Sequence, residues 1–475
     1  MDITQGEEEH FDVVVIGAGM SGLAAGIRLA LFDKKVLLLE RHNAIGGLNS
    51  FYSIDGRKYD VGLHAMTNYA PGVKTGSLTK IARQLRIDLE AFRLSPQKQS
   101  KIVFGGCDLF FNNSLDFLKS QVRFQFPDQI DAFCRLCEAV NSDFHALSPE
   151  KWNVSVWKVL PEFISNSLLI NMLMLPLLSY GSSQENDIPW NQFVVLFKSI
   201  FLEGLARPYE GIRVILRILK DKYKSLGGLR KMKCGVRQIK ACQGKVQSLI
   251  LDDGTVISAD HVISSIGYPE TLRLCSDKEQ TEVDENIGRI SFVETITVIN
   301  DQPKSLGWKD TIIFFNDSEH LEYKCPDSLV NPNLGVICIP NNYDYSDDCE
   351  LSEGFLRITA LANYKSWKGL SNTDYREQKK IWFDRLQSKA FEYLQVVDDS
   401  YVKSITLASD MFTPKTIEKY TGRLGGAVYG ATYKNPTGET HLKNLYICGT
   451  DQGLLGVVGS MMSGIVMANR HVLAK

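Results

Sequence analysis

Phe11-Asp-Val-Val-Val-Ile16 leads directly into Gly17-Ala18-Gly19-Met20-Ser21-Gly22, and eighteen residues after Gly22 the chain reaches Glu40 at the end of Val36-Leu-Leu-Leu39. This order predicts a strand, a glycine turn, a helix and a second strand that ends in an acid. A βαβ unit with this spacing is typical of dinucleotide-binding proteins. A plain strand-turn-helix without a ligand is the alternative.

Each glycine of the turn has a physical role in the dinucleotide interpretation. Gly17 permits the tight turn, Gly19 lets the backbone approach a pyrophosphate, and Gly22 lets the helix pack closely on its strand. The N-terminus of the helix then offers free N–H groups to the phosphates. Glu40 is expected to accept hydrogen bonds from an adenosine ribose.

Two further glycine-rich segments point to a larger cofactor. After Arg41, the run Ala44-Ile45-Gly46-Gly47-Leu48-Asn49 places a second glycine pair just past the ribose-binding acid, where backbone can again approach a ligand closely. Near the other end, the apolar run Leu445-Tyr-Ile-Cys448 precedes Gly449-Thr450-Asp451-Gln452-Gly453. A helix is predicted to start at Gly456-Val457-Val458.

These motifs resemble the two-part FAD signature of the flavoprotein superfamily that contains amine oxidases. Along nearly the whole chain the sequence is similar to the branch with phytoene desaturases, carotenoid isomerases and retinol saturases. The motifs that carry this resemblance are GAGMSGLAAG at 17–26, Tyr59-Asp-Val-Gly62-Leu63-His64, Gly426-Ala-Val-Tyr-Gly430 and Asn444-Leu-Tyr-Ile-Cys-Gly-Thr-Asp-Gln452. No cysteine lies in a flavin-attachment pattern, so the resemblance implies a noncovalent FAD.

The resemblance also implies individual cofactor contacts. Asp451 would bind the ribityl hydroxyls, residues 456–458 would supply N–H groups near the flavin, and Val236 would touch the adenine through its backbone. Two departures from the family pattern affect this: Leu48 replaces a basic residue, and Gly449-Thr450-Asp451 shifts the position of the acid. The predicted cofactor-binding residues are Gly17, Ala18, Gly19, Met20, Ser21, Gly22, Glu40, Arg41, Gly46, Gly47, Leu48, Asn49, Gly62, Leu63, His64, Val236, Gly449, Thr450, Asp451, Gly456, Val457 and Val458.

Composition sets the class of protein. The chain has 475 residues, is 44% hydrophobic and carries a formal charge of −2, which argues against nucleic acid as a partner. Ten cysteines in so long a chain, with an acidic and polar start at Met1 to His10, indicate reduced thiols in the cytoplasm. Cys134 and Cys137 form one CxxC inside a helical pattern. We therefore expect buried helix cysteines and no metal site.

The fold predicted is α/β, with a discontinuous Rossmann-type FAD-binding domain and an α+β substrate-binding domain. The parallel-sheet FAD domain comprises residues 1–68, 208–281 and 421–475, and includes a hairpin through Asp253-Gly254. The substrate domain comprises residues 69–207 and 282–420. It is expected to contain a mixed or antiparallel sheet with one layer of apolar helices.

One apolar region allows three interpretations. Phe163 to Tyr180 carries no charge and is broken by Pro176, and a second apolar run follows from Phe193 to Leu202. It is a core helix, the wall of a tunnel for a long hydrocarbon, or a patch that dips into one membrane leaflet. A cytoplasmic protein with peripheral membrane contact fits the last interpretation.

The sequence favours an FAD-dependent oxidoreductase that desaturates, saturates or isomerises C=C bonds of a long isoprenoid, carotenoid or acyl substrate. His64 is the leading acid–base residue, ahead of Tyr429 and Asp410, although it can instead bind backbone or flavin without moving a proton. The alternatives are an amine or amino-acid oxidase and a flavin-containing lipid-binding protein without turnover. Without a second GxGxxG unit, the redox partner is expected to be a quinone, O₂ or an electron carrier.

Overall fold

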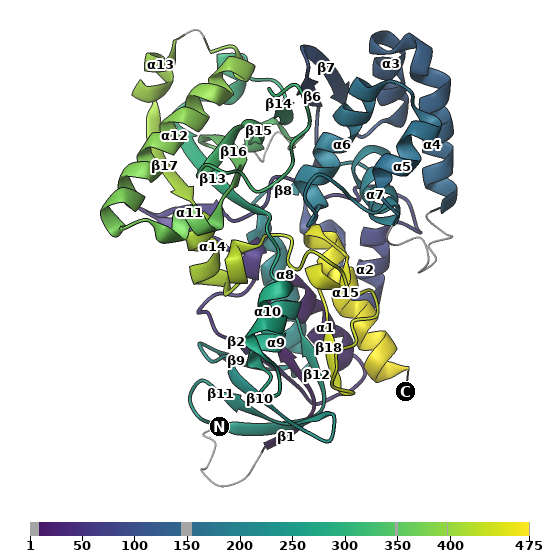
Figure 1. Cartoon of the computed structure of the whole chain (residues 1–475), viewed down its shortest axis with the longest axis vertical. Helices are drawn as coiled ribbons and strands as arrows, with labels where there is room; N and C mark the ends of the chain where they lie inside the picture. The colour runs from purple at the N-terminus through teal and green to yellow at the C-terminus, as the bar shows by residue number, and fades with distance from the viewer. Residues whose placement is uncertain (1–8, 144–153, 347–349, 397, 475) are drawn as a thin grey trace.

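The computed structural model describes residues 9–143, 154–346, 350–396 and 398–474. Two large sheets organise it, one in the lower and one in the upper half of Figure 1. The lower sheet has the order β10-β11-β12-β1-β2-β9, and β18 pairs with β12. Its strands are β1 (Glu9–Ile16), β2 (Val36–Glu40), β9 (Leu229–Met232), β10 (Val236–Cys242), β11 (Lys245–Leu251), β12 (Val256–Ser264) and β18 (Leu445–Ile447).

The centre of the lower sheet is parallel, as predicted for a Rossmann-type unit. β1 pairs in parallel with β12 and with β2, and β12 pairs in parallel with β18. The Asp253-Gly254 turn joins β11 to β12 in an antiparallel pair, so that hairpin is confirmed. All seven strands fall within the three segments predicted for the FAD domain. The exact domain boundaries stay a prediction.

Helices cover one face of the lower sheet. α1, α8 and α15 pack over its central strands in one apolar cluster that also includes α2. The other face packs through Val14, Ile16 and Leu37 against apolar residues of β10 and β11, the two outer strands of the same sheet. The helices of this half are α1 (Met20–Ala30), α2 (Ser77–Leu85), α8 (Ile212–Ser225), α9 (Tyr268–Leu274), α10 (Gln280–Glu285) and α15 (Gly456–Ala468).

The upper sheet has the order β17-β13-β16-β15-β14-β6-β7. All its pairs are antiparallel except β14 with β6, which is parallel, so the predicted mixed sheet is present. Its strands are β6 (Ser100–Phe104), β7 (Cys107–Phe111), β13 (Ser291–Ile299), β14 (Ile312–Asn316), β15 (Val330–Cys338), β16 (Gly354–Ala362) and β17 (Thr406–Phe412).

Helices cover both faces of the upper sheet, so the single helical layer predicted from sequence is wrong. Phe314 faces the cluster of α6 and α7, whereas its neighbour Phe315 faces the cluster of α12. Both faces are buried because successive side chains of a strand point to opposite sides. The helices are α3 (Leu115–Gln125), α4 (Ile130–Asp143), α5 (Val156–Phe163), α6 (Ser167–Gly181), α7 (Trp190–Phe197), α11 (Tyr364–Gly369), α12 (Asn372–Leu394), α13 (Asp399–Ser404) and α14 (Pro414–Thr421).

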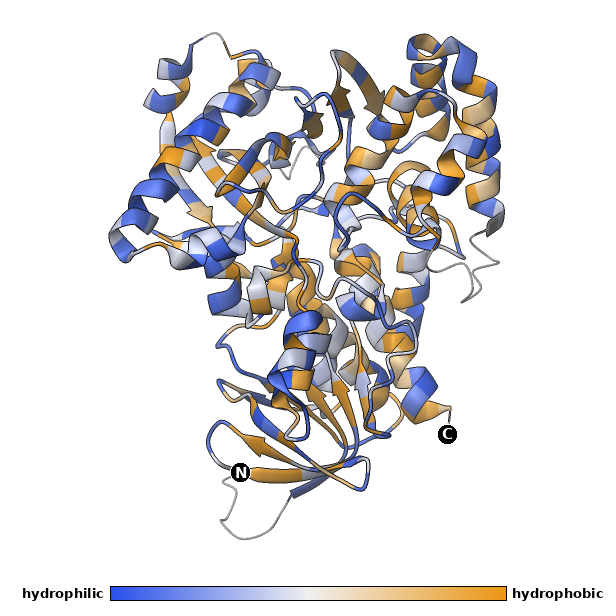
Figure 2. Ribbon diagram, viewed as in Figure 1, coloured by the Kyte–Doolittle hydropathy of each residue, from blue (hydrophilic) through white to orange (hydrophobic). Residues whose placement is uncertain are grey.

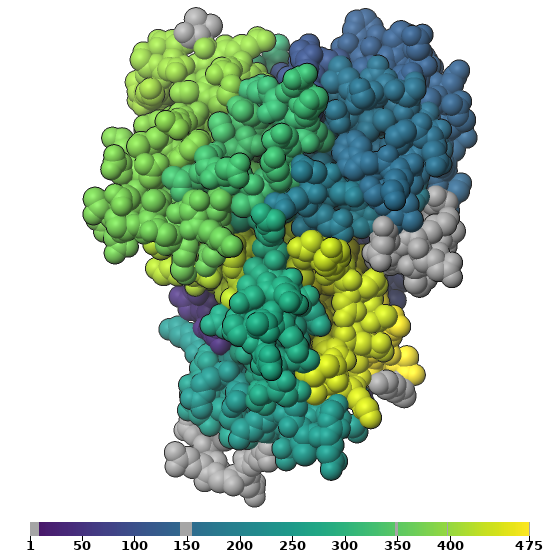
Figure 3. Space-filling model, in the orientation of Figure 1, coloured from purple at the N-terminus to yellow at the C-terminus, as the bar shows by residue number. Residues whose placement is uncertain are grey.

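Short ribbons connect the two halves. β3 (Phe51–Ile54) pairs with β4 (Arg57–Asp60), and β5 (Leu94–Pro96) pairs with β8 (Ala206–Pro208). In the space-filling view, the C-terminal segment, in yellow, reaches the surface between the lower half and the upper lobes (Figure 3). The two halves therefore meet where the chain passes repeatedly from one sheet to the other.

The apolar region around α6 lies in the core. Asn166 caps the helix by accepting a hydrogen bond from Leu169 N at 3.0 Å, and residues 169–170 and 172–179 are buried. Apolar residues run through α6 and α7 (Figure 2). Of the three interpretations, this burial favours core or tunnel wall over a surface patch. Among the described residues, no helix is both long and apolar enough to span a bilayer.

Candidate functional site

The first glycine turn joins β1 to α1 and has the geometry that a dinucleotide requires. Gly17 has a left-handed φ of +96°, and a Cβ there would lie 2.6 Å from Ser265 Oγ. A Cβ on Gly22 would lie 2.0 Å from Gly17 O, so the helix packs directly on the turn. At Gly19 the nearest atom to such a Cβ is Gly46 O at 4.0 Å, which leaves one side of this backbone open.

The second glycine pair lies against the first turn. Gly46 N donates a hydrogen bond to Ala18 O at 2.9 Å, and Gly19 and Gly46 form a parallel bridge. The nearest neighbour of a Cβ on Gly47 would be Gly19 Cα at 3.8 Å. The two turns thus form one surface without side chains, which we call the glycine cradle (Gly17, Gly19, Gly46 and Gly47). Such a surface fits the backbone approach of a diphosphate.

Glu40 ends β2 beside the cradle and orders it. Its carboxylate accepts hydrogen bonds from Ala18 N at 2.9 Å and from His42 N at 2.8 Å, and it remains partly accessible. A carboxylate has about four lone-pair sites, so capacity for a ribose hydroxyl remains. Next to it, Arg41 donates to Val236 O at 3.0 Å, so that carbonyl, expected beside an adenine, already has a partner.

The C-terminal motif packs directly on the N-terminal one. α15 lies so close to α1 that a Cβ on Gly464 would be 2.0 Å from Ser21 O, and one on Gly449 would be 2.8 Å from Ser21 Oγ. Gly456, at the start of α15, has a φ of +70° and no atom within 4 Å of a Cβ position. The structure therefore brings together the two glycine segments that the sequence places at opposite ends of the chain.

Accessibility divides the predicted cofactor residues into two sets. An atom that contacts a ligand must be reachable from the groove that holds it. The accessible set is Gly17, Gly19, Glu40, Arg41, Gly47, Leu48, Asn49, Gly62, His64, Thr450 and Gly456. The buried set is Ala18, Met20, Ser21, Gly22, Gly46, Leu63, Val236, Gly449, Asp451, Val457 and Val458. Residues of the second set are packed inside the protein.

Asp451, predicted to bind the ribityl hydroxyls, is enclosed by protein groups. Its side chain is 0% exposed, and its two carboxylate oxygens accept hydrogen bonds from Ala431 N at 2.8 Å and from Tyr268 N at 2.5 Å. It also pairs with Arg423 at 3.4 Å and with Lys434 at 3.8 Å. Protein groups therefore already bind both carboxylate oxygens, and the ribityl contact stays a prediction. The accessible neighbour is Thr450, one residue earlier in the shifted motif.

Asp451 belongs to a buried cluster of two acids and two bases, the lower ionic cluster (Glu270, Arg423, Lys434 and Asp451). Glu270 lies 3.5 Å from Arg423 and accepts a hydrogen bond from Leu424 N at 2.8 Å. Burial raises the pKa of Glu270 to about 7 and lowers the pKa of Lys434 to about 8. Burial alone would raise the pKa of Asp451, but Arg423 and Lys434 hold it below its usual value. The cluster ties the start of α9 to the C-terminal motif.

His64 lies at the junction of the two halves. Its Nε2 is 3.0 Å from Thr359 Oγ1 and 3.4 Å from Glu294 Oε1, and its side chain is 11% exposed. Burial lowers the pKa of His64, although Glu294 acts in the opposite direction. The imidazole is therefore neutral near pH 7 and has defined partners on the upper sheet.

Two arginines that the sequence reasoning missed hold the backbone of this segment. Arg207 donates to Leu63 O at 2.5 Å and pairs with Asp60, and Arg357 donates to Leu63 O at 2.6 Å and pairs with Glu294. We call these four charged residues the upper ionic cluster (Asp60, Arg207, Glu294 and Arg357), and His64 lies beside it. The signal in the sequence was a charged residue inside each of two apolar strand patterns, at 294 and at 357.

The other two predicted acid–base residues lie away from His64. Asp410 accepts a hydrogen bond from Tyr52 OH at 2.8 Å and pairs with Lys379 at 3.5 Å, which is a structural contact on β17. Tyr429 donates to Ser179 O at 2.5 Å, and burial raises its pKa above its usual value. Neither contacts the imidazole, so the structure does not assemble the three predicted residues into one site.

An aromatic cluster extends from His64 into the upper half. The Tyr180 ring lies 6.0 Å from the imidazole and 5.0 Å from the Phe314 ring, which continues to Phe111 at 6.3 Å. The Tyr180 hydroxyl is buried and has no hydrogen-bond partner among the described residues. His64 thus lies where the polar junction meets the apolar core of the upper half.

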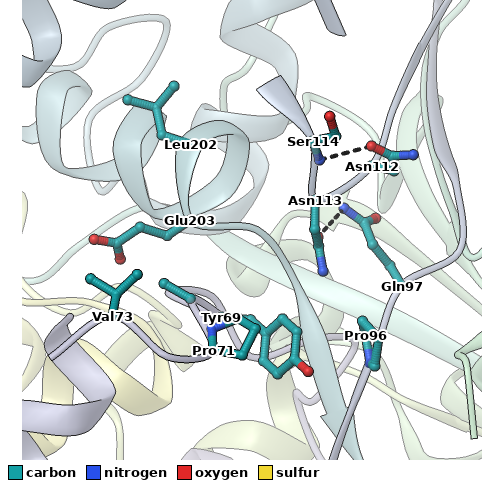
Figure 4. Close-up of a pocket in the computed structure, with 11 residues that line it drawn as sticks. Tyr69, Pro71, Val73, Pro96, Gln97, Asn112, Asn113, Ser114, Leu202 and Glu203 are labelled. Atoms are coloured by element: carbon teal, nitrogen blue, oxygen red, sulfur yellow. Dashed lines mark hydrogen bonds between the residues drawn. The ribbon is translucent and has the colours of Figure 1, made fainter. Parts of the chain in front are cut away.

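A separate surface pocket of about 540 Å³ lies beside α7 and β5 (Figure 4). Gln97 donates to Asn113 Oδ1 at 2.9 Å on one side of it, and the Glu203 carboxylate on the other accepts from Asn68 at 2.6 Å. Glu203 is the one titratable carboxylate among its lining residues. The pocket therefore lacks a pair of groups for acid–base chemistry, and it lies apart from the glycine cradle.

Comparisons with known proteins agree with the geometry of the cradle. Residues 15–78 match the family described as NAD(P)-binding Rossmann-like domain. The chain is 23% identical to chloroplastic prolycopene isomerase of Daucus carota, over 98% of this chain and 80% of that protein. It is 24% identical to all-trans-retinol 13,14-reductase of Danio rerio, over 98% of this chain and 87% of that protein.

A solved structure shows the same fold over the full length. Putrescine oxidase bound to putrescine superposes with a TM-score of 0.62 at 14% identity, covering 98% of this chain and 99% of that one. The resemblance predicted from the motifs is confirmed by these similarities, as is the α/β fold class. They support a nucleotide-type cofactor, flavin or dinucleotide, in the Rossmann-like half.

Proposed function

We propose that this chain, a relative of the carotenoid isomerases and retinol reductases in the FAD-containing amine oxidase superfamily, is an FAD-dependent oxidoreductase. It desaturates, saturates or isomerises C=C bonds of a long hydrophobic isoprenoid, carotenoid or acyl molecule. The observation that carries the proposal is the packing of Gly449 and α15 on α1, the helix that begins at the glycine cradle. Relatives similar over 98% of the chain act on polyenes by name, which supports the substrate class.

The residues present fit FAD, because the backbone is open where a diphosphate would pass. Gly19 and Gly47 would approach the diphosphate and Glu40 would accept from the ribose, while α1 directs its N-terminal N–H groups toward the phosphates. Thr450 and Gly456 would face the ribityl chain and the ring. FAD, when bound, supplies the acceptor or donor of a hydride.

The protein side of the chemistry is assigned to His64. Its neutral imidazole can accept or donate one proton, and Thr359 and Glu294 fix its Nε2 edge. The upper ionic cluster holds the backbone carbonyl of Leu63 and so fixes the position of the neighbouring His64 imidazole. Tyr180, the buried phenol next to it, offers one polar contact in an otherwise apolar surface.

The substrate region is assigned to the surface between His64 and the aromatic cluster of α6 and β14. Its residues are large and apolar, they exclude water, and few of them could bind a charged group. A polyene or an acyl chain needs this kind of environment. A quinone, O₂ or an electron carrier is proposed as redox partner, and the nine described cysteines, all unpaired, agree with a cytoplasmic location.

A first experiment tests the reaction class. The full chain, loaded with FAD, is incubated with isoprenoid polyenes and unsaturated acyl lipids in both the oxidised and the reduced state, and products are analysed by chromatography and mass spectrometry. We expect a mass change of two hydrogens or a new geometric isomer. If all substrates remain unchanged in both redox states, the proposal is wrong.

An amine or amino-acid oxidase is the second candidate, because the putrescine oxidase fold matches the full chain. Anaerobic mixing with a polyamine or an amino acid would then bleach the flavin rapidly, and air would release peroxide. Under our proposal the same mixture leaves the flavin spectrum unchanged. Photoreduction followed by trial acceptors identifies the redox partner in either case.

His64→Gln tests the assignment of the proton. The amide keeps a polar atom near Thr359 and Glu294 but cannot exchange a proton, so we expect turnover to fall by about 10²–10⁴-fold with FAD still bound. Turnover within threefold of wild type would show that His64 only binds its neighbours. Thr359→Val is the control, since it removes the hydroxyl partner and keeps the imidazole.

A further inference from the structure

A sulfur, an imidazole and a carboxylate meet at the surface of the lower half, away from the glycine cradle. Cys275 Sγ, His441 and an oxygen of Asp277 all lie within 4.8 Å of one another. Cys275 directly follows α9, whereas His441 precedes β18, so the two sides of this group come from segments 164 residues apart. The sequence predicts no metal site, because its one CxxC, at Cys134 and Cys137, lies in a helical pattern.

We propose that Cys275, Asp277 and His441 form a zinc site. Thiolate, imidazole and carboxylate are the three side-chain ligands that Zn²⁺ takes in proteins, and a tetrahedral site with three protein ligands keeps its fourth position for water. Other common divalent ions fit less well. Mg²⁺ and Ca²⁺ prefer oxygen ligands, and a thiolate with an imidazole selects a softer ion.

The spacing of the donor atoms is close to that of a tetrahedral site. His441 Nε2 lies 3.1 Å from one Asp277 oxygen and 3.3 Å from the other. Bonds of about 2.0–2.3 Å to the ion place neighbouring ligand atoms roughly 3.2–3.8 Å apart. The imidazole and carboxylate already meet this spacing, and the Cys275 sulfur lies within 4.8 Å of both.

The backbone on both sides of the group is held in place. Cys275 bridges to Ile239 of β10, and Ser276 N donates to Ile239 O at 3.1 Å. On the other side, Thr440 Oγ1 accepts from Leu442 N at 3.1 Å and donates to Leu445 O at 2.9 Å, which fixes the turn that carries His441. The ligands are thus presented by rigid segments.

Lys278, the charged residue next to this group in sequence, forms its ion pair outside the group. Lys278, next to Asp277 in sequence, pairs with Glu282 at 2.8 Å. Binding of Zn²⁺ displaces the proton of the Cys275 thiol to solvent and leaves a thiolate–zinc bond, so one proton is released for each ion bound. Burial favours the thiol in the metal-free protein, consistent with the sulfur donating to Thr271 O at 3.4 Å.

A bound ion would connect the end of α9 to the segment that enters β18. β18 leads into Gly449 and α15, which form the C-terminal side of the cofactor groove. We expect Zn²⁺ to raise the melting temperature of the full chain, because an ion that binds only the folded state stabilises it.

The test uses the full chain with whatever flavin it retains. After chelator treatment, Zn²⁺ is added and measured by calorimetry and by metal analysis of the desalted protein. Co²⁺ is added separately, and the near-ultraviolet thiolate-to-cobalt absorption is recorded. We expect one tightly bound Zn²⁺ per chain and a thiolate–cobalt band.

Variants assign the ion to this group. Cys275→Ser abolishes the thiolate–cobalt band, and His441→Gln weakens Zn²⁺ binding by more than the roughly 10–100-fold that the loss of an outer-shell partner costs. His441 lies at the surface, so its replacement leaves folding intact even if Cys275→Ser does not. Cys242→Ser, which removes the exposed cysteine of the neighbouring β10, is the matched control and keeps both signals. Absence of stoichiometric binding, or binding that persists in His441→Gln, would overturn the proposal.

Discussion

The two ionic clusters contain the same charges but use them differently. The upper ionic cluster directs two arginines at the backbone of residues 60–64 and leaves an imidazole at its accessible end. The side chains of both clusters are buried, but in the lower ionic cluster burial moves the pKa of two of them toward neutrality. A buried ion pair is weak evidence for stability by itself, because desolvation opposes the attraction. The difference shows which cluster positions the imidazole of His64 and which one holds two segments together.

Arg357→Met should have the largest effect, because it leaves the Glu294 carboxylate buried without its cation. We expect the free energy of unfolding to fall by about 3–5 kcal/mol, measured by urea denaturation. The double variant Arg357→Met, Glu294→Leu should recover part of this loss, since it removes the uncompensated charge. A single variant within about 1 kcal/mol of wild type would contradict the role of the upper cluster.

Asp451→Asn should have the next largest effect and separates a structural role of this residue from the predicted ribityl contact. The amide cannot accept from both Tyr268 N and Ala431 N, so we expect a loss of about 2–3 kcal/mol in stability. The affinity of the folded protein for FAD, measured by flavin fluorescence, should change less than tenfold. Thr450→Val, at the accessible neighbour, should instead lower the affinity for FAD more than it lowers stability. Loss of FAD from Asp451→Asn at unchanged stability would instead support the ribityl role.

Glu270→Gln should change how stability depends on pH. Since the folded-state pKa is raised from 4.5 to about 7, the folded chain keeps a proton between these values that the unfolded chain has released. The contribution of Glu270 is therefore fully present below pH 4.5 and is lost as pH rises through 7. We expect the stability of the variant relative to wild type to increase across this window and to level off above it, measured by melting temperature. Glu322→Gln, at an exposed position, is the control and should show no such trend.

Asp410→Asn should have the smallest effect. Its pair with Lys379 is partly exposed, so we expect a loss of at most about 1 kcal/mol and no change in turnover. Turnover reduced more than tenfold, with FAD still bound, would return Asp410 to the list of reacting groups. Lys379→Met tests the same pair from its other side.

Local patterns in the sequence predicted the elements well where one physical rule decides the structure. The glycine spacing, the Asp-Gly hairpin and the apolar runs at 294–299 and 355–361 all identify elements of the fold. The 23-residue helix α12, which covers the second face of the upper sheet, was not predicted, because its apolar residues follow no clear stripe. The upper sheet, which helices cover on both faces, was therefore predicted to have one helical layer.

The site was less predictable, because its partners are far apart along the chain. Asp60 meets Arg207 across 147 positions, and His64 meets Thr359 across 295. Local residue spacing in a sequence does not identify pairs that are so far apart. The position of Asp451 shows the same limit: its motif identified the turn, while the direction of its carboxylate depends on Arg423 and Lys434, which lie in another segment.

The contact between Gly464 of α15 and Ser21 of α1 has a consequence for biosynthesis. During translation the first glycine turn leaves the ribosome more than 400 residues before the helix that covers it. The nascent polypeptide can fold its early strands but cannot close the groove around a prosthetic group until residue 464 has emerged. Under the proposed function, flavin binding waits for this helix, and a ribosome stalled before it would carry a colourless intermediate.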